Sequence, residues 1–515
     1  MFRGDLEHSF RVPASLEGLA QDREAPARPG RIELGDWQTP VELADAVMGL
    51  VAGIEPGARA VLEPTCGRGA FLVAARRALP AARLVGYELR HEYVTGAREA
   101  LVGTGACVEE ADFFETSWES VLEALPEPFV VVGNPPWVTS ATLGVLAGTN
   151  APVRSNFKKH GGLDALTGKS NFDISEWMIR RLVEAARGRR FTLAMLCKAS
   201  VARRLIERAA AERWPFAGSV RAVDARAHFS AAVSAVLLVL EGKMASTAPG
   251  DEPDWALYSS LGASVPSSRL GVRAGRAVRD LEAQRRTEPL EAQRRTEPLE
   301  AGKARAAAWR SGVKHDLARV MELTRSGDGL ANGLGERVEV EPAHVYPLLK
   351  SSDLANERGG VERYLLVTQT GLGADTTALR ASAPRAWQYL ERHRAAFDAR
   401  KSRIYRGQPP FAMFGIGPYS FAPYKVAISG LHKRLRFRVV GPRDGRPVLL
   451  DDTSYFLPCD DEAAACRCAE LLGSELAREF FEARVFWDDK RPVSKALLGS
   501  LSLEALAERL GVAAE

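Results

Sequence analysis

The sequence predicts an α/β domain with a mostly parallel sheet over residues 31–243, followed by a second domain of mixed α+β structure. In the first stretch, short apolar runs alternate with amphipathic helical patterns, which is typical of a parallel sheet with helices on both faces. The chain has 515 residues, of which 46% are hydrophobic. It can therefore bury two or more cores, so at least two domains are expected.

Composition narrows the class of protein. The six cysteines are scattered without paired C-x-x-C spacing, which indicates a reducing cytoplasm and neither disulfides nor zinc. No apolar run approaches the roughly 18–20 residues of a membrane span, and the N-terminus lacks a secretory apolar region. The 69 basic and 65 acidic residues leave a net charge of +4. This balance permits nucleic-acid binding without arguing for it.

The first predicted strand, 61–63, runs into a glycine turn and then a helix. Gly67 and Gly69 tolerate positive φ and let the backbone approach a ligand, and the N–H groups at the start of the helix suit a carboxylate. The second strand, 84–88, ends at Glu88, an acid in the position that usually binds ribose hydroxyls. Further along, Asp112 can accept a hydrogen bond from an adenine amine while Phe113 packs on the ring.

A fourth apolar run, 129–132, leads into Gly133 and then Asn134-Pro135-Pro136-Trp137. Proline lacks the N–H and fixes φ, so the strand has to end there in a rigid turn. Open α/β sheets place their ligands just past such strand ends. The turn offers an amide, backbone carbonyls and an aromatic face, which together can hold a planar base by its exocyclic amine. The alternative is a proline-terminated strand with an incidental Asn and Trp.

The order of these motifs resembles the S-adenosylmethionine-dependent DNA adenine-N6 methyltransferases of restriction–modification systems. The similarity is to their gamma arrangement, in which the catalytic domain precedes the target-recognition domain. Further motifs agree: Gln38-Thr39-Pro40 before a helical pattern over 41–51, Asp173 before a helix over 174–186, a strand over 191–196, and His228-Phe229 before a strand over 233–240. Trp137 stands where Tyr or Phe is commoner.

The resemblance implies a Rossmann-like fold for the first domain, S-adenosyl-L-methionine as cofactor and no metal. It implies the following catalytic residues: Asn134, Pro135, Pro136, Trp137 and Phe229. It implies the following cofactor-binding residues: Gln38, Thr39, Pro40, Glu63, Pro64, Thr65, Gly67, Gly69, Phe71, Glu88, Leu89, Asp112, Phe113 and Asn134. Trp137 and Phe229 are expected to stack on opposite faces of a flipped-out base.

Four segments are predicted along the chain. Residues 1–30 form a polar tail, 31–243 the methyltransferase domain, 244–305 a linker and 306–515 the DNA target-recognition domain. The linker contains an exact tandem nonapeptide repeat, 281–289 and 290–298, which indicates recent duplication; alternatively, repeat number sets the distance between the domains. A basic, glycine-bearing insertion in the 140s to 169 either closes over the substrate strand or is a plain surface loop.

The last 210 residues alternate glycine and aromatic residues with cations, which suits a DNA-binding surface. The following cations are expected to contact phosphates: Lys314, Lys350, Lys401, Arg403, Arg406, Lys425, Lys433, Arg434 and Arg436. The aromatics Phe414, Tyr419 and Phe421 are expected in the core. Glu241-Gly242-Lys243 fits half of a nuclease motif but ends a predicted strand of the first domain, so we expect the chain to modify DNA and not to cut it.

These observations predict a site-specific methyltransferase for double-stranded DNA. It would act as a monomer or dimer, with a possible separately encoded restriction endonuclease. Three alternatives remain: an RNA adenine-N6 methyltransferase, a protein glutamine-N5 methyltransferase and a non-catalytic DNA-binding protein. The protein methyltransferase is disfavoured because it has no use for the C-terminal domain. The non-catalytic DNA-binding protein is disfavoured because it has no use for a full set of reactive residues.

Overall fold

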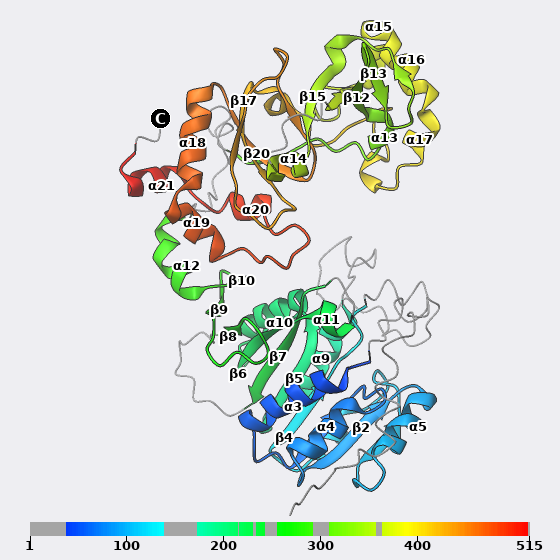
Figure 1. Cartoon of the computed structure of the whole chain (residues 1–515), viewed down its shortest axis with the longest axis vertical. Helices are drawn as coiled ribbons and strands as arrows, with labels where there is room; N and C mark the ends of the chain where they lie inside the picture. Colours follow the sequence, from blue (N-terminus) through cyan, green and yellow to red (C-terminus); the bar gives the residue numbers. More distant parts are fainter. Residues whose placement is uncertain are drawn as a thin grey trace, which may run out of the picture. The chain divides into compact units, whose positions relative to one another are not determined.

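The structure is a computed structural model, and it describes residues 38–138, 173–214, 216–229, 233–242, 255–291, 308–356 and 363–512. The chain divides into two compact units, Met1–Leu281 and Glu282–Glu515, and each is described by itself (Figure 1). The predicted polar tail over 1–30 and the insertion up to residue 169 lie outside the described residues.

The first unit is built on a ten-stranded sheet with the order β10-β9-β8-β6-β7-β5-β4-β1-β2-β3. Strands β3, β2, β1, β4 and β5 are parallel, β7 is antiparallel to its neighbours, and β8 runs parallel to β6. The strands are β1 (Ala60–Glu63), β2 (Arg83–Glu88), β3 (Cys107–Glu110), β4 (Phe129–Gly133), β5 (Phe191–Lys198), β6 (Ala217–Val223), β7 (Ala235–Gly242), β8 (Trp255–Tyr258), β9 (Ser268–Arg273) and β10 (Arg276–Val278). The predicted α/β class is confirmed.

Helices connect and flank these strands. They are α3 (Val41–Ile54), α4 (Ala70–Ala78), α5 (His91–Ala100), α6 (Trp118–Glu123), α9 (Ile174–Ala185), α10 (Ala199–Ala211) and α11 (Ala225–Phe229). Strands β4 and β5 are almost wholly buried along their length. Because alternate side chains of a strand point to opposite faces, the sheet is covered on both.

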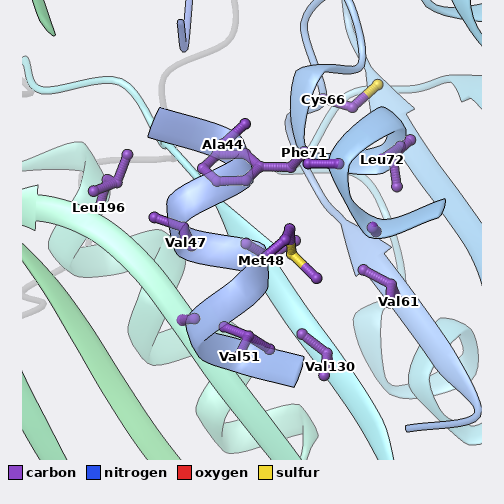
Figure 2. Packing of buried hydrophobic residues seen from close by; sticks show 14 of the residues in the cluster. Ala44, Val47, Met48, Val51, Val61, Cys66, Phe71, Leu72, Val130 and Leu196 are labelled. Carbon is purple, nitrogen blue, oxygen red and sulfur yellow. The ribbon is translucent and has the colours of Figure 1, made fainter. Parts of the chain in front are cut away.

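Helix α3 shows why one of those faces is stable. Its apolar residues recur every three or four positions, so they form one stripe. Val47, Met48 and Val51 are completely buried, and Figure 2 shows them lying between Leu196 on one side and Val61 on the other. Each such side chain contributes about 1.5–3 kcal/mol by leaving water. The segment that precedes α3, residues 38–40, is thereby fixed beside the strand ends.

One stretch differs from the expected linker over 244–305. Within it, residues 255–278 form β8, β9 and β10, which extend the sheet beyond β6. The first copy of the nonapeptide follows as α12 (Leu281–Thr287) and the 3-10 turn η3 (Glu288–Leu290). The helix ends two residues before Pro289, as expected of a residue that cannot continue one. Most of the second copy lies outside the described residues.

The second unit contains two mainly antiparallel sheets, with the orders β14-β13-β12-β16-β15-β19 and β11-β20-β17-β18. Their strands are β11 (Arg310–Ser311), β12 (Glu322–Ser326), β13 (Gly329–Asn332), β14 (Arg337–Val338), β15 (Val345–Leu349), β16 (Arg363–Leu366), β17 (Tyr424–Ser429), β18 (Arg438–Val440), β19 (Leu449–Leu450) and β20 (Ser454–Cys459). The predicted mixed α+β structure is confirmed here.

The helices of the second unit form two groups (Figure 1). The α-helices are α13 (Ala318–Met321), α14 (Ser351–Asn356), α15 (Leu379–Ser382), α16 (Pro384–Arg392), α17 (Arg394–Asp398), α18 (Glu462–Gly473), α19 (Glu475–Glu482), α20 (Lys495–Leu498) and α21 (Leu503–Leu510). The 3-10 turns are η4 (Pro342–His344), η5 (Thr376–Ala378), η6 (Arg403–Tyr405) and η7 (Pro418–Phe421). Helices α15 to α17 pack with the first sheet, and α18 to α21 with the second.

The expected core aromatics of this unit are half-buried. Phe421 packs edge-on against Tyr346 and Tyr419 lies near Phe456. Among the described residues of either unit, no helix combines the length and the apolar character that crossing a membrane requires. All six cysteines are free thiols.

Candidate active site

The candidate site lies at the carboxyl ends of β1, β2 and β4. Strand β1 pairs with β2 on one side and with β4 on the other, so the chain order reverses between β1 and β4. Such a reversal is where open α/β sheets bind their ligands. Glu63 ends β1 and Asn134 follows β4, so the two predicted motifs flank this point.

The glycine turn after β1 is held by backbone and side-chain bonds. Gly67 has a φ of +53°, and its N–H donates to Glu88 Oε2 at 2.8 Å. Arg68 N–H donates to Gln38 Oε1 at 3.3 Å. The segment before α3 therefore reaches the glycine turn, as expected if these two sequence motifs bind the same cofactor. Thr65 Oγ1 is buried without a hydrogen-bond partner among the described residues.

Two acids of the predicted cofactor set lie close to this turn. Glu88 accepts hydrogen bonds from two backbone N–H groups, those of Gly67 and Arg90, at 2.8 and 2.9 Å. Glu63 is 3% exposed. Burial first, and then the negative charge of Glu88, raise the pKa of Glu63 well above its usual value, while a hydrogen bond from the Leu72 backbone opposes the shift. Leu89 is half exposed, and Phe71 is completely buried in the core (Figure 2).

Asp112 and Phe113 lie beyond β3, at the same edge of the sheet. Asp112 Oδ1 accepts from Phe114 N–H at 2.8 Å. The Phe113 ring is buried against Trp118, with ring centroids 4.6 Å apart, and against Trp177 at 6.1 Å. Little of this ring is left for packing on a purine. In this structure Phe113 therefore offers a smaller stacking surface to the cofactor adenine than the sequence predicts.

The proline turn after β4 is held at both ends. Asn134 Nδ2 donates to Thr39 Oγ1 at 3.4 Å, which connects the turn to the segment before α3. Pro135 is buried and Pro136 half-buried. At the other end, Ile174 N–H donates to Val138 O at 2.9 Å. The turn is therefore a fixed corner, as its two prolines predict.

Trp137 and Phe229 touch each other directly. Their ring centroids are 5.3 Å apart at an interplanar angle of 73°, and both rings belong to one core cluster. Phe229 ends α11, whose first turn is capped by Asp224 Oδ1 accepting from Arg226 and Ala227 N–H groups. The two rings were expected to sandwich a base, but in this arrangement no base fits between them.

Asp173 and Lys198 form an ion pair beside the corner. The sequence did not predict this ion pair. Asp173 is 6% exposed; its Oδ2 accepts from Lys198 Nζ at 2.7 Å and its Oδ1 accepts from Ser175 Oγ at 2.6 Å. Asp173 also caps α9, through the Ser175 N–H. An Asp before a helical pattern signals a cap, but nothing local indicates Lys198, which ends β5.

The nine cations predicted to contact phosphates divide into two sets. Three are engaged within the second unit: Lys314 with Asp316 at 2.7 Å, Lys350 with Glu322 at 2.6 Å, and Lys425 with the Ala422 carbonyl at 2.6 Å. Lys425 is 1% exposed, and burial lowers its pKa to about 8, so it cannot reach a phosphate from this position. The other six are exposed: Lys401, Arg403, Arg406, Lys433, Arg434 and Arg436.

No group of three or more His, Cys, Asp or Glu side chains in the described ranges is placed to hold a metal ion.

Comparison with known proteins identifies a relative that covers most of the chain. The chain is similar to the type II methyltransferase M.NspV of a Nostoc species, with 38% identity over 487 residues that cover 93% of this chain and 98% of the relative. No family model matches the chain.

One solved structure supports the fold of the chain, and a second is similar to part of it. The type IIL restriction–modification enzyme MmeI, solved in complex with DNA, has a TM-score of 0.50 and 14% identity, covering 89% of this chain and 64% of that one. This chain thus spans less than two thirds of MmeI. A putative class I S-adenosylmethionine-dependent methyltransferase of Listeria monocytogenes has a TM-score of 0.32 and 13% identity, over 48% of this chain and 72% of that one.

Proposed function

Because the chain belongs to the type II methyltransferase family, we propose that it transfers a methyl group from S-adenosylmethionine to N6 of an adenine at a specific site in duplex DNA. One observation carries the choice of adenine N6. The Asn134 turn follows β4, which pairs with β1, so its amide lies at the same edge of the sheet as Glu63 and the glycine turn, where a cofactor would be held.

The residues around the glycine turn fit that cofactor. Gly67 lets the backbone come close, and a methyl group at its position would lie 2.6 Å from Gln38 Oε1. Glu63 Oε2 is buried and lacks a hydrogen-bond partner within the described part of the chain, as expected of an atom that a ligand completes. Glu63 and Gln38 would hold the methionine part, and Glu88 the ribose. Bound there, the cofactor supplies a methyl group on a sulfonium, ready for direct transfer.

Asn134 prepares the adenine amine for that transfer. Adenine N6 is a poor nucleophile because its lone pair is delocalised into the ring. Hydrogen bonds from N6–H₂ to Asn134 Oδ1 and the Pro135 carbonyl would draw the nitrogen towards tetrahedral geometry and localise the pair. Because Nδ2 already donates to Thr39 Oγ1, Oδ1 is the amide atom that would accept from N6–H₂. Positioning and fixed dipoles then supply most of the rate. As the N–C bond forms, the bond from the methyl carbon to sulfur would break, and one N6 proton would be lost to solvent.

The target base has to leave the helix to reach this corner, at a cost of a few kcal/mol. Trp137 and Phe229 would offset this by stacking, at about 1–3 kcal/mol per base–aromatic contact. Because the two rings now lie edge-on to each other, they have to separate first. That exchange loses an aromatic pair worth about 0.5–1.5 kcal/mol, which the stacked base more than replaces.

The second unit would bind the duplex. The six predicted phosphate contacts that are exposed lie in two segments, 401–406 and 433–436, and such side chains bind phosphates by releasing counterions. Phosphate contacts set the register of a protein on DNA but do not read its sequence. We further propose that the chain is the modification component of a restriction–modification system, with a separately encoded endonuclease, and that it acts as a monomer or dimer in the cytoplasm.

Asn134→Ala tests the catalytic assignment. The variant should lose tritiated-methyl transfer to duplex DNA but keep the ability to bind S-adenosylmethionine, since the Asn134 amide acts mainly on the amine. Duplex DNA, RNA and a protein extract are offered in parallel, and methylated nucleosides are identified by mass spectrometry. A fully active variant, or label found mainly in RNA or protein, would contradict the proposal.

A further inference from the structure

Glu63 is a buried acid placed among groups that do not satisfy it. It is 3% exposed at the end of β1, and its Oε2 makes no hydrogen bond to any described residue. A backbone hydrogen bond from Leu72, in the first turn of α4, is the only stabilising interaction of its charged form that the structure shows. A buried carboxylate with an unsatisfied oxygen is costly.

The charged groups around Glu63 do not offset its charge. From β2 it faces Glu88, a second acid. From the turn it faces the Cys66 thiol, whose pKa is raised by burial and then by Glu63 itself. Two arginines of this region, Arg68 and Arg90, lie over the Tyr93 ring at 5.2 and 5.3 Å, and no lysine or arginine in the described ranges forms an ion pair with Glu63. The position suits a positive charge that the protein does not provide.

We propose that the Glu63 carboxyl group binds the cationic methionine part of the cofactor, and that it is protonated in the free protein and ionised in the complex. Each binding event then releases one proton. The inference rests on the proposed cofactor site and adds a linkage between that site and pH. Desolvation favours the neutral acid before binding, and a nearby positive charge favours the carboxylate afterwards.

The affinity for the cofactor should depend on pH. Because the free protein carries the proton and the complex does not, binding becomes tighter as pH rises. Below the pKa of Glu63 in the free protein, the association constant should increase tenfold per pH unit. At about pH 6 a free α-amino group, with an ordinary pKa near 7.7–8.0, is already protonated, so the cofactor itself contributes no proton change.

Isothermal titration of the full chain with S-adenosylmethionine, in two buffers of different ionisation enthalpy, measures the protons released. At about pH 6 we expect proton release for the wild type and none for Glu63→Gln. Glu110→Gln is the matched control, since Glu110 also ends a strand of this sheet but is exposed and pairs with His91; it should release the proton as the wild type does.

A second ligand keeps the test independent of the folding of the variant. 5′-Methylthioadenosine lacks the charged methionine part, so its binding to the wild type should release no proton. Equal release with both ligands, no release with S-adenosylmethionine, or full release by Glu63→Gln would each overturn the inference. If S-adenosylmethionine produces no binding heat in either buffer and does not displace labelled cofactor, the proposed cofactor site fails instead.

Discussion

Gly67→Ala separates the role of the glycine turn in folding from its role in binding. Gly67 has a φ of +53°, in the left-handed region that costs a residue with a side chain about 1–2 kcal/mol. A unit of this size should lose roughly 2–4 °C in melting temperature for each kcal/mol. Gly103→Ala is the matched control, because Gly103 also has a positive φ, +77°, but has open space around its Cα.

Only Gly67→Ala should affect the cofactor. The new methyl group would lie 2.6 Å from Gln38 Oε1, so Gln38 has to move and gives up its hydrogen bond from Arg68. A hydrogen bond of this kind contributes about 0.5–1.5 kcal/mol, which corresponds to up to about tenfold in the dissociation constant.

Calorimetric unfolding and isothermal titration on the two variants measure these effects separately. The melting temperatures should fall by similar amounts, while the dissociation constant for S-adenosylmethionine should rise in Gly67→Ala alone. If both variants bind the cofactor equally well, or both lose it equally, the contact between Gln38 and the glycine turn does not matter for binding.

Three other predictions concern the second unit and the aromatic pair. Burial and the charge of Lys350 lower the pKa of His315 from 6.5 to about 4. The neutral form of His315 therefore contributes about 3 kcal/mol at most to stability, and this contribution is present above pH 6.5 and lost as pH falls towards 4. Calorimetry should show that His315→Asn unfolds less readily in acid than the wild type. Phe229→Leu should lower kcat/KM for duplex DNA by about 10–100-fold, the value of one base stack, with unchanged cofactor affinity; an unaltered rate would exclude stacking. Arg403→Ala with Arg406→Ala should lower the slope of log binding constant against log salt by about 1.8 if each contacts a phosphate, as fluorescence anisotropy on labelled duplex would show.

The sequence predicts the strand ends of the first unit well because their signals are local. An apolar run that stops at Glu63, Glu88 or Gly133 marks a buried strand, and parallel strands bring their carboxyl ends to one edge. Strands β8 to β10 carry no such signal. They extend one side of the sheet, and arginines interrupt the apolar residues of β9 and β10. The turn of the hairpin between β9 and β10 is formed by Ala274 and Gly275, both with positive φ. Their pattern therefore read as a linker.

Side-chain contacts across the site were beyond local signals. The edge-on contact of Trp137 with Phe229 depends on how a helix end packs against the corner, and the two residues are far apart in the chain. The pair of Asp173 with Lys198 likewise joins a helix cap to a strand end. Such contacts depend on the tertiary arrangement, whereas the residue types that the chemistry needs can be recognised in the sequence.

The anchored start of the duplicated nonapeptide limits what duplication can change. The two units join at Leu281–Glu282, inside the first copy, and Leu290 and Trp309 belong to one core of the second unit. Further copies would thus lengthen a connection whose two ends are pinned in the same core, at about 0.4 kcal/mol for nine more residues by polymer statistics. The covalent junction between the units stays the same. We therefore expect copy number to have little effect on stability and on the reach between the units.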